Sequence, residues 1–172
     1  MSEIEVWRID APETLPAVLP HGFLFGKEAG IAFDSTAFCL TWMPLLQADL
    51  AIILWATVDG KRAASIGGVI GPDLFDGART LFEAWWYVED RYRSGGVGRV
   101  LFDRFEKEAA AAECKRVTMV HLANVMPERV ARIYEAGGYA KIETHYRKEI
   151  GCAAASCENY RPTEGDKRTE AD

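Results

Sequence analysis

The segment Arg93-Ser94-Gly95-Gly96-Val97-Gly98 combines glycine with positive charge where an apolar stretch gives way to an amphipathic one. A glycine has no Cβ atom, so a phosphate group can approach its backbone closely. If a helix begins here, its first N–H groups have no intrahelical partner and can bind an anion. Arg91 and Arg99 add positive charge on either side. The spacing therefore predicts an anion-binding turn, although a glycine-rich surface turn has the same composition.

The same segment resembles the Arg-x-x-Gly-x-Gly pyrophosphate-binding motif of the GNAT superfamily of N-acetyltransferases, which use acetyl-coenzyme A (acetyl-CoA). Residues 87–93 are similar to the family's Val-x-Pro-x-Tyr-Arg lead-in, with Asp90 where proline is common. Residues 133–139, Ile-Tyr-Glu-Ala-Gly-Gly-Tyr, are similar to the Leu-Tyr-Glu-x-x-Gly-Phe end of its last helix. The resemblance is strong over residues 81–145. It implies an α/β fold (α+β in some schemes), the GNAT fold, with a mixed, mostly antiparallel sheet flanked by helices.

The resemblance also implies where acetyl-CoA binds. Its pantetheine arm would lie between two parallel strands that separate after Val88 and Leu122, and a backbone N–H near Val88 would polarise the thioester carbonyl. Asn124 lies ten residues before Tyr134, where seven is common in the family, so it is either a cofactor contact or a turn or capping residue. The residues assigned to the cofactor are Tyr87, Val88, Arg93, Ser94, Gly95, Gly96, Val97, Gly98, Arg99 and Asn124.

The chemistry implied by the resemblance is direct attack of an amine on the acetyl thioester, through a tetrahedral intermediate and without a covalent enzyme intermediate. Tyr134 matches the tyrosine that gives a proton or a hydrogen bond to the departing thiolate in this family. Its alternative role is packing in the core, with its hydroxyl on a backbone carbonyl.

Glu83 is the first candidate for the base that takes a proton from the incoming ammonium. It lies in the apolar segment 81–88, five residues before Val88, where this family often has a glutamate. If the segment alternates as a strand, Trp85 and Tyr87 share the face of Glu83. The carboxylate then lies either in an apolar cleft that raises its pKa toward neutrality or at a wet strand edge.

His121 is the second candidate for the base, because it lies near the end of a predicted central strand. A lone histidine in a strand is more often a structural residue with satisfied hydrogen bonds. His145 is a weaker candidate. Some members of the family use ordered water in place of a dedicated base.

Hydrophobic periodicity predicts the elements that position these residues. Asp34 and Ser35 predict the start of one helix, and Asp59-Gly60 predicts a tight hairpin. Four breakers over residues 12–22 predict no more than a single helical turn there. The predicted strands are 4–9, 51–58, 62–70, 81–88, 116–122 and 140–150, and the predicted helices are 35–47, 97–112 and 127–137.

Composition limits the class of protein. With 172 residues, 49% of them hydrophobic, the chain suffices for one domain with a sizeable core. A formal net charge of −6 argues against a general nucleic-acid surface and favours cationic amines as partners. The four cysteines have neither Cys-x-x-Cys spacing nor matching histidines, so no metal site is predicted. With no recognisable signal peptide or membrane span, we expect a cytoplasmic protein.

These observations predict a GNAT acetyltransferase domain over residues 1–150, as a monomer or homodimer, and a mobile tail over residues 151–172. The predicted function is acetyl-CoA-dependent N-acetylation of a primary amine on a small molecule or a protein. The alternative is a non-catalytic GNAT-fold module with a structural or interaction role. Residues 86–88 and 144–146 have a vague likeness to bacteriophage-encoded members of the family, some of which serve in virions or act against the host.

Overall fold

The computed structural model describes residues 2–148 of the chain. The predicted tail, and with it the predicted domain boundary at residue 150, lies outside the described residues. The chain divides into two compact units, one ending at Val120 and the other beginning at His121.

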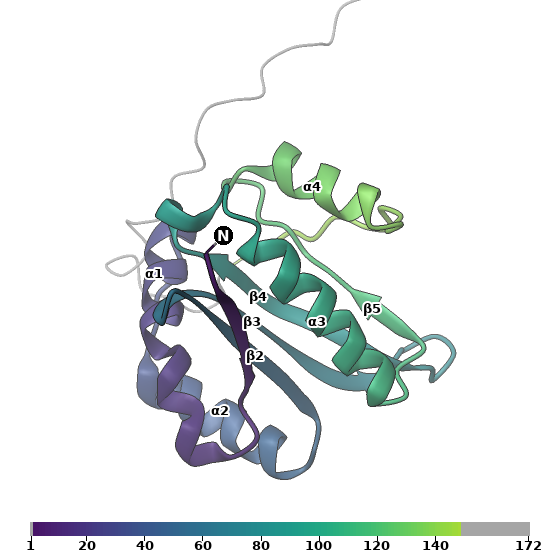
Figure 1. Ribbon diagram of the computed structural model, residues 1–172. Helices are drawn as coiled ribbons and strands as arrows, with labels where there is room; N and C mark the ends of the chain where they lie inside the picture. Colours follow the sequence, from purple (N-terminus) through teal and green to yellow (C-terminus); the bar gives the residue numbers. More distant parts are fainter. Residues whose placement is uncertain (1, 149–172) are drawn as a thin grey trace, which may run out of the picture. The chain divides into compact units, whose positions relative to one another are not determined.

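The first unit is built on one five-stranded sheet whose spatial order follows the sequence (Figure 1). The first three neighbouring pairs are antiparallel, and the last pair is parallel. This confirms the predicted mixed, mostly antiparallel sheet. The strands are β1 (Ile4–Arg8), β2 (Ala51–Val58), β3 (Lys61–Pro72), β4 (Arg79–Val88) and β5 (Arg116–Thr118).

Helices cover both faces of this sheet. Helix α3 lies on one face, and helices α1 and α2 lie on the other (Figure 1). Phe105 and Leu101 of α3 enter one hydrophobic core, whereas Trp42 and Leu46 of α2 enter the second. The helices of the first unit are η1 (Pro12–Val18), α1 (Leu19–Ala29), α2 (Ser35–Gln47), η2 (Asp90–Tyr92) and α3 (Val97–Ala111), and the second unit contains α4 (Pro127–Ala136).

The predicted helix α2 is confirmed with its cap. The Asp34 carboxylate accepts hydrogen bonds from the backbone N–H groups of Thr36 and Ala37, at 2.8 and 2.9 Å. The predicted hairpin is also confirmed, since Asp59 and Gly60 both have positive φ between β2 and β3. That conformation matches the right-handed twist of a two-residue hairpin.

The prediction of a single helical turn near the N-terminus is wrong. Residues 12–18 form η1, and α1 continues for eleven residues. Pro12 and Pro20 lie in the first two positions of η1 and α1 respectively. The N–H groups at these positions have no acceptor within the helix, so a proline is tolerated there and does not break the helix.

Two predicted strands differ from the structure, one in length and one in its existence. β5 ends at Thr118 instead of residue 122, because the N–H of Val120 bonds to the Glu83 side chain rather than to a strand backbone. Residues 140–148 form no strand, which contradicts the predicted strand 140–150 over its described part. Ile142 is 76% exposed. The side chains of residues 141–148 are all exposed, so the alternation that predicted a strand does not correspond to a buried face.

Candidate functional site

The glycine turn, residues 93–98, connects β4 to α3 through η2. Gly96 is the N-cap of α3 and has φ +83°, a conformation that favours glycine. Since Gly96 has no side chain, the first N–H groups of α3 receive no side-chain cap. The predicted anion-binding geometry, backbone N–H groups at the start of a helix, is therefore present.

The arginines of this turn have different environments. Arg93 donates from Nε to the carbonyl oxygen of Val88 at 3.0 Å and forms ion pairs with Glu28 and Asp90. Only 18% of its side chain is exposed. Arg93 therefore ties the end of β4 to helix α1 and to the turn itself. Arg99 is 55% exposed and pairs with an acid on its own helix, so its guanidinium lies at the surface beside the turn.

The glycines of the turn also differ in what surrounds them. A Cβ atom on Gly98 would lie 3.2 Å from Val88 and 3.4 Å from Trp86, so this glycine faces β4. It permits close packing of helix on strand. Gly95 is exposed, and a Cβ there would meet only the backbone oxygen of Tyr92, at 3.5 Å. Gly95 and Gly96 are the positions where a ligand can approach the backbone.

Pairing between β4 and β5 ends early. The parallel ladder joins Thr80 to Phe82 with Arg116 to Thr118 and goes no further. The two strands therefore part six residues before Val88, where the sequence had placed their separation. Among the described residues, no strand pairs with this edge of β4 over residues 83–88.

Backbone alternation decides which groups point to the open edge. The N–H of Glu89 donates to the carbonyl of Ala63 on β3, and backbone groups of successive residues point in opposite directions. The groups of Tyr87 therefore face β3, whereas those of Trp86 and Val88 face the open edge. Of the two residues expected to offer backbone contacts to the donor, Val88 therefore faces the open edge and Tyr87 does not.

Glu83 lies where the two strands part. Its Oε2 accepts a hydrogen bond of 2.9 Å from the backbone N–H of Val120. Burial raises the pKa of this carboxyl to about 8, and the bond from Val120 opposes the shift only in part. A group with this pKa changes charge near neutral pH, as a general acid or base requires.

The predicted shared face of Glu83, Trp85 and Tyr87 is wrong. The register between β3 and β4 shifts at this point, so Glu83 pairs with Gly68 and Trp85 pairs with Gly67. A Cβ on Gly68 would contact Phe105 of α3, whereas one on Gly67 would contact the Trp85 ring. The β-bulge therefore turns Glu83 toward the face of α3 and the two aromatic residues toward the face of α1 and α2.

His21 of α1 is a polar residue of this region that the sequence analysis missed. It is fully buried, its ring centroid lies 5.5 Å from that of Tyr87, and its Nε2 lies 3.4 Å from Glu89 Oε1. Its buried Nδ1 has no hydrogen-bond partner within the described chain. Burial lowers the pKa of His21 to about 4, although Glu89 acts in the opposite direction. The only sequence signal was a histidine inside a segment read as loop.

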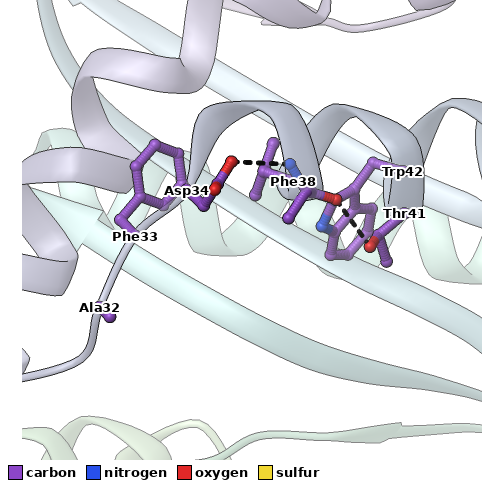
Figure 2. Close-up of a pocket in the computed structure, with 7 residues that line it drawn as sticks. Ala32, Phe33, Asp34, Phe38, Thr41 and Trp42 are labelled. Atoms are coloured by element: carbon purple, nitrogen blue, oxygen red, sulfur yellow. Dashed lines mark hydrogen bonds between the residues drawn. The ribbon is translucent and has the colours of Figure 1, made fainter. Parts of the chain in front are cut away.

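A pocket of about 300 Å³ lies beside the start of α2 (Figure 2). Phe33, Phe38 and Trp42 supply aromatic surface, and Asp34 and Thr41 supply polar groups. We call it the aromatic pocket. It lies within residues 32–42.

The remaining predicted site residues belong to the second unit. His121 and Asn124 are exposed. Asn124 lies in a turn, and Met126 is the N-cap of α4, so the capping alternative for Asn124 is wrong. Tyr134 is buried, with its ring 5.9 Å from that of Tyr139. The catalytic roles of His121 and Tyr134 and the cofactor contact of Asn124 stay predictions.

The described residues contain no group of three or more side chains suited to hold a metal ion. None of their helices has the length and apolar character that crossing a membrane requires.

The model of the acetyltransferase (GNAT) family matches residues 25–138, more than half of the chain. The protein belongs to the GNAT acetyltransferase family. This membership confirms the predicted fold class and the predicted acetyl donor, acetyl-CoA. A search of curated proteins found no significant match.

Solved structures with the same fold include three acetyltransferases of low sequence identity. A ribosomal-protein-alanine N-acetyltransferase from Brucella melitensis biovar Abortus 2308 has a TM-score of 0.65 and 18% identity, over 87% of this chain and 100% of that one. An aminoglycoside acetyltransferase from an uncultured soil metagenomic sample has a TM-score of 0.69 and 15% identity, over 86% of this chain and 99% of that one. An aminoglycoside N-acetyltransferase in complex with CoA has a TM-score of 0.68 and 17% identity, over 88% of this chain and 97% of that one.

Proposed function

We propose that this GNAT protein transfers the acetyl group of acetyl-CoA to a primary amine. The observation that carries the proposal is the open edge of β4 over residues 83–88, which leads into the glycine turn. An extended chain can hydrogen bond along such an edge as an added strand does. The anionic end of the same ligand then reaches the N-terminus of α3.

The chain offers a specific set of groups for the donor. The backbone N–H groups of Gly96 and Val97 face the pyrophosphate, together with those of Ser94, Gly98 and Arg99. Gly95 allows the pyrophosphate to approach closely, while its own N–H donates to the carbonyl oxygen of Tyr92. Arg99 adds a surface charge beside them. Arg93 acts indirectly, by holding Val88 and α1 in place. Bound here, acetyl-CoA supplies an activated acetyl thioester.

The proposed reaction is direct attack by the acceptor nitrogen on the thioester carbon, through a tetrahedral intermediate. A C–N bond forms, the C–S bond breaks, and the thiolate leaves. Glu83 accepts the proton that the acceptor ammonium must lose, either directly or through water. The Val88 N–H stabilises charge on the carbonyl oxygen, and Tyr134 protonates the departing thiolate. The second proton, which the nitrogen loses on becoming an amide, returns to Tyr134 through water.

The acceptor is proposed as an amine on a small molecule or on a protein. Two kinds of similar structure support an amine acceptor, since their names specify ribosomal-protein alanine and aminoglycosides. The formal net charge of −6 also favours the approach of ammonium groups. A cytoplasmic location and a monomeric or homodimeric state are part of the same proposal.

The experiment is acceptor-dependent release of free thiol from acetyl-CoA, with mass analysis of the product. The panel contains polyamines, amino acids, aminoglycosides and peptides. We expect N-acetylated product and thiol release that depends on both substrates. Calorimetric titration with acetyl-CoA runs in parallel and measures donor binding independently of turnover.

The same two measurements separate the proposal from its alternative. Donor binding without transfer to any panel member would contradict the proposed amine classes and direct the search to an unusual macromolecular acceptor. Absence of donor binding would favour a non-catalytic GNAT-fold module.

A further inference from the structure

The aromatic pocket presents ring faces that are fixed by their own packing. The ring centroid of Phe38 lies 5.4 Å from Phe33, 5.8 Å from Trp42 and 5.4 Å from Trp85 of β4. Trp42 meets Trp85 edge to face at 4.9 Å, and the Trp85 indole N–H donates to Ser65 at 3.1 Å. The faces of such rings attract cations, so the walls suit a positively charged group.

Asp34 brings a negative charge to the rim of the same pocket. Its Oδ1 accepts both capping bonds of α2, whereas its Oδ2 accepts no hydrogen bond from the described residues. Among those residues, no lysine, arginine or histidine forms an ion pair with Asp34. Figure 2 shows Asp34 at the first turn of α2, with Phe38 and Trp42 further along the helix. An exposed carboxylate without a counter-ion lies beside aromatic faces.

Trp85 connects the aromatic walls of the pocket to the end of β4, where the reaction is proposed. Trp85, which contacts both Phe38 and Trp42, lies three residues before Val88. At about 3.3 Å per residue, this separation is roughly 10 Å along β4. One extended aliphatic chain can span it.

We propose that the aromatic pocket binds a second, non-reacting ammonium group of a di- or polyamine acceptor, whose other amino group receives the acetyl group. The inference rests on the proposed N-acetyltransferase function. Asp34 is the counter-ion of the anchored ammonium, and the rings of Phe38 and Trp42 contact its methylene groups and its charge. The pocket therefore selects amines that carry a second positive charge over amines with one.

The first test compares two acceptors of equal length, 1,8-diaminooctane and 8-aminooctan-1-ol, which differ only in the second ammonium. We expect a KM for the diamine that is several-fold lower. Asp34→Asn removes the charge and keeps a good helix cap. In that variant we expect the KM for the diamine to rise roughly three- to tenfold, with little change for the amino alcohol or for acetyl-CoA.

The matched control is Asp49→Asn, which removes the same charge just beyond the other end of α2. Asp49 has positive φ, which asparagine adopts readily. We expect this variant to keep the preference for the diamine. Equal KM values for both acceptors in the unmodified protein, or an unchanged preference in Asp34→Asn, would overturn the proposal.

A second measurement tests the pocket without catalysis. Calorimetric titration of the protein alone should detect binding of 1,8-diaminooctane and weaker binding of the amino alcohol, and Phe38→Leu should reduce the former. If transfer fails but this difference persists, the pocket assignment holds and the proposed function fails. If transfer to other amines succeeds without any difference, the pocket assignment fails alone.

Discussion

Glu83 keeps its proton through the neutral range, because burial raises its pKa to about 8. A general base must be unprotonated, so only a fraction of the protein is active at neutral pH if Glu83 has this role. The bond from the Val120 N–H fixes the carboxyl where β4 and β5 part. Position and pKa together make Glu83 a better candidate than the exposed His121.

The first prediction concerns the pH dependence that Glu83 imposes. In the unmodified protein, kcat should rise with pH and level off above about 8, the pKa of this group. Glu83→Gln should lower kcat by about 10²- to 10⁴-fold and remove that limb, because the amide cannot accept the proton. Steady-state kinetics across pH measures both effects. An unchanged profile in Glu83→Gln, with the limb lost in His121→Asn, would reverse the order of the two candidates.

The second prediction concerns Tyr134. Tyr134→Phe should lower kcat by about 10²-fold if a proton donor to the thiolate is lost, with the affinity for acetyl-CoA nearly unchanged. The phenylalanine ring preserves the contact with the Tyr139 ring. Tyr139→Phe is therefore the matched control and should keep full activity. Equal kcat values for all three proteins would assign Tyr134 to packing.

Among the elements, the glycine turn contains one glycine that allows α3 to pack on β4 and others that allow a ligand to approach the backbone. A large side chain at Gly98 would collide with Val88 and Trp86, so it would disturb the fold as well as the ligand site. At Gly96, φ +83° strains any residue that has a Cβ. Gly95 has neither constraint.

The third prediction therefore uses Gly95→Leu. We expect it to weaken acetyl-CoA binding at least tenfold, since its side chain occupies the space that the pyrophosphate needs, while the melting temperature changes little. Calorimetry and thermal unfolding give the two quantities. Gly77→Leu, in an exposed turn before β4 with φ +71°, is a control for backbone strain and should not weaken binding. Undiminished affinity in Gly95→Leu would rule out this placement of the pyrophosphate.

The sequence predicted those elements whose signals are local. The cap at Asp34 gave the start of α2, the Asp59-Gly60 pair gave the hairpin, and the glycine turn gave the start of α3. α1 was missed because the sequence alone does not distinguish a proline in the first turn of a helix, such as Pro20, from a proline in a loop.

Other features of the site depend on contacts between distant residues. The bulge that turns Glu83 away from Trp85 arises from pairing with β3. The alternation of polar and apolar residues within β4 does not indicate it. Glu89, which lies beside His21, and Glu28, one of the partners of Arg93, are 68 and 65 residues away in sequence. The best sequence signal for His21 is its place directly after Pro20, a proline that can lie in the first turn of a helix.

At the scale of the whole molecule, two buried groups shape the dependence of stability on pH. The folded protein holds a proton on Glu83 between pH 4.5 and about 8, where an unfolded carboxyl has lost it. Stability therefore falls as pH rises through this window. His21 stays neutral in the folded protein between pH 6.5 and about 4, where an unfolded imidazole gains a proton. Stability therefore falls as pH decreases through that second window.

The fourth prediction follows from the overlap of these windows. Between pH 4.5 and 6.5 the two effects oppose each other, so the melting temperature should be highest there and should fall from pH 6.5 to about 8, where Glu83 acts alone. Asp76, with a pKa lowered to about 2 by its bond to Arg116, acts only at more acidic pH. Thermal unfolding from pH 4 to 9 measures the profile. Glu83→Gln should abolish the fall above pH 6.5, because a neutral amide has no proton to lose. If the fall persists in that variant, other groups cause it, and Glu83 is already ionised in the folded protein at neutral pH.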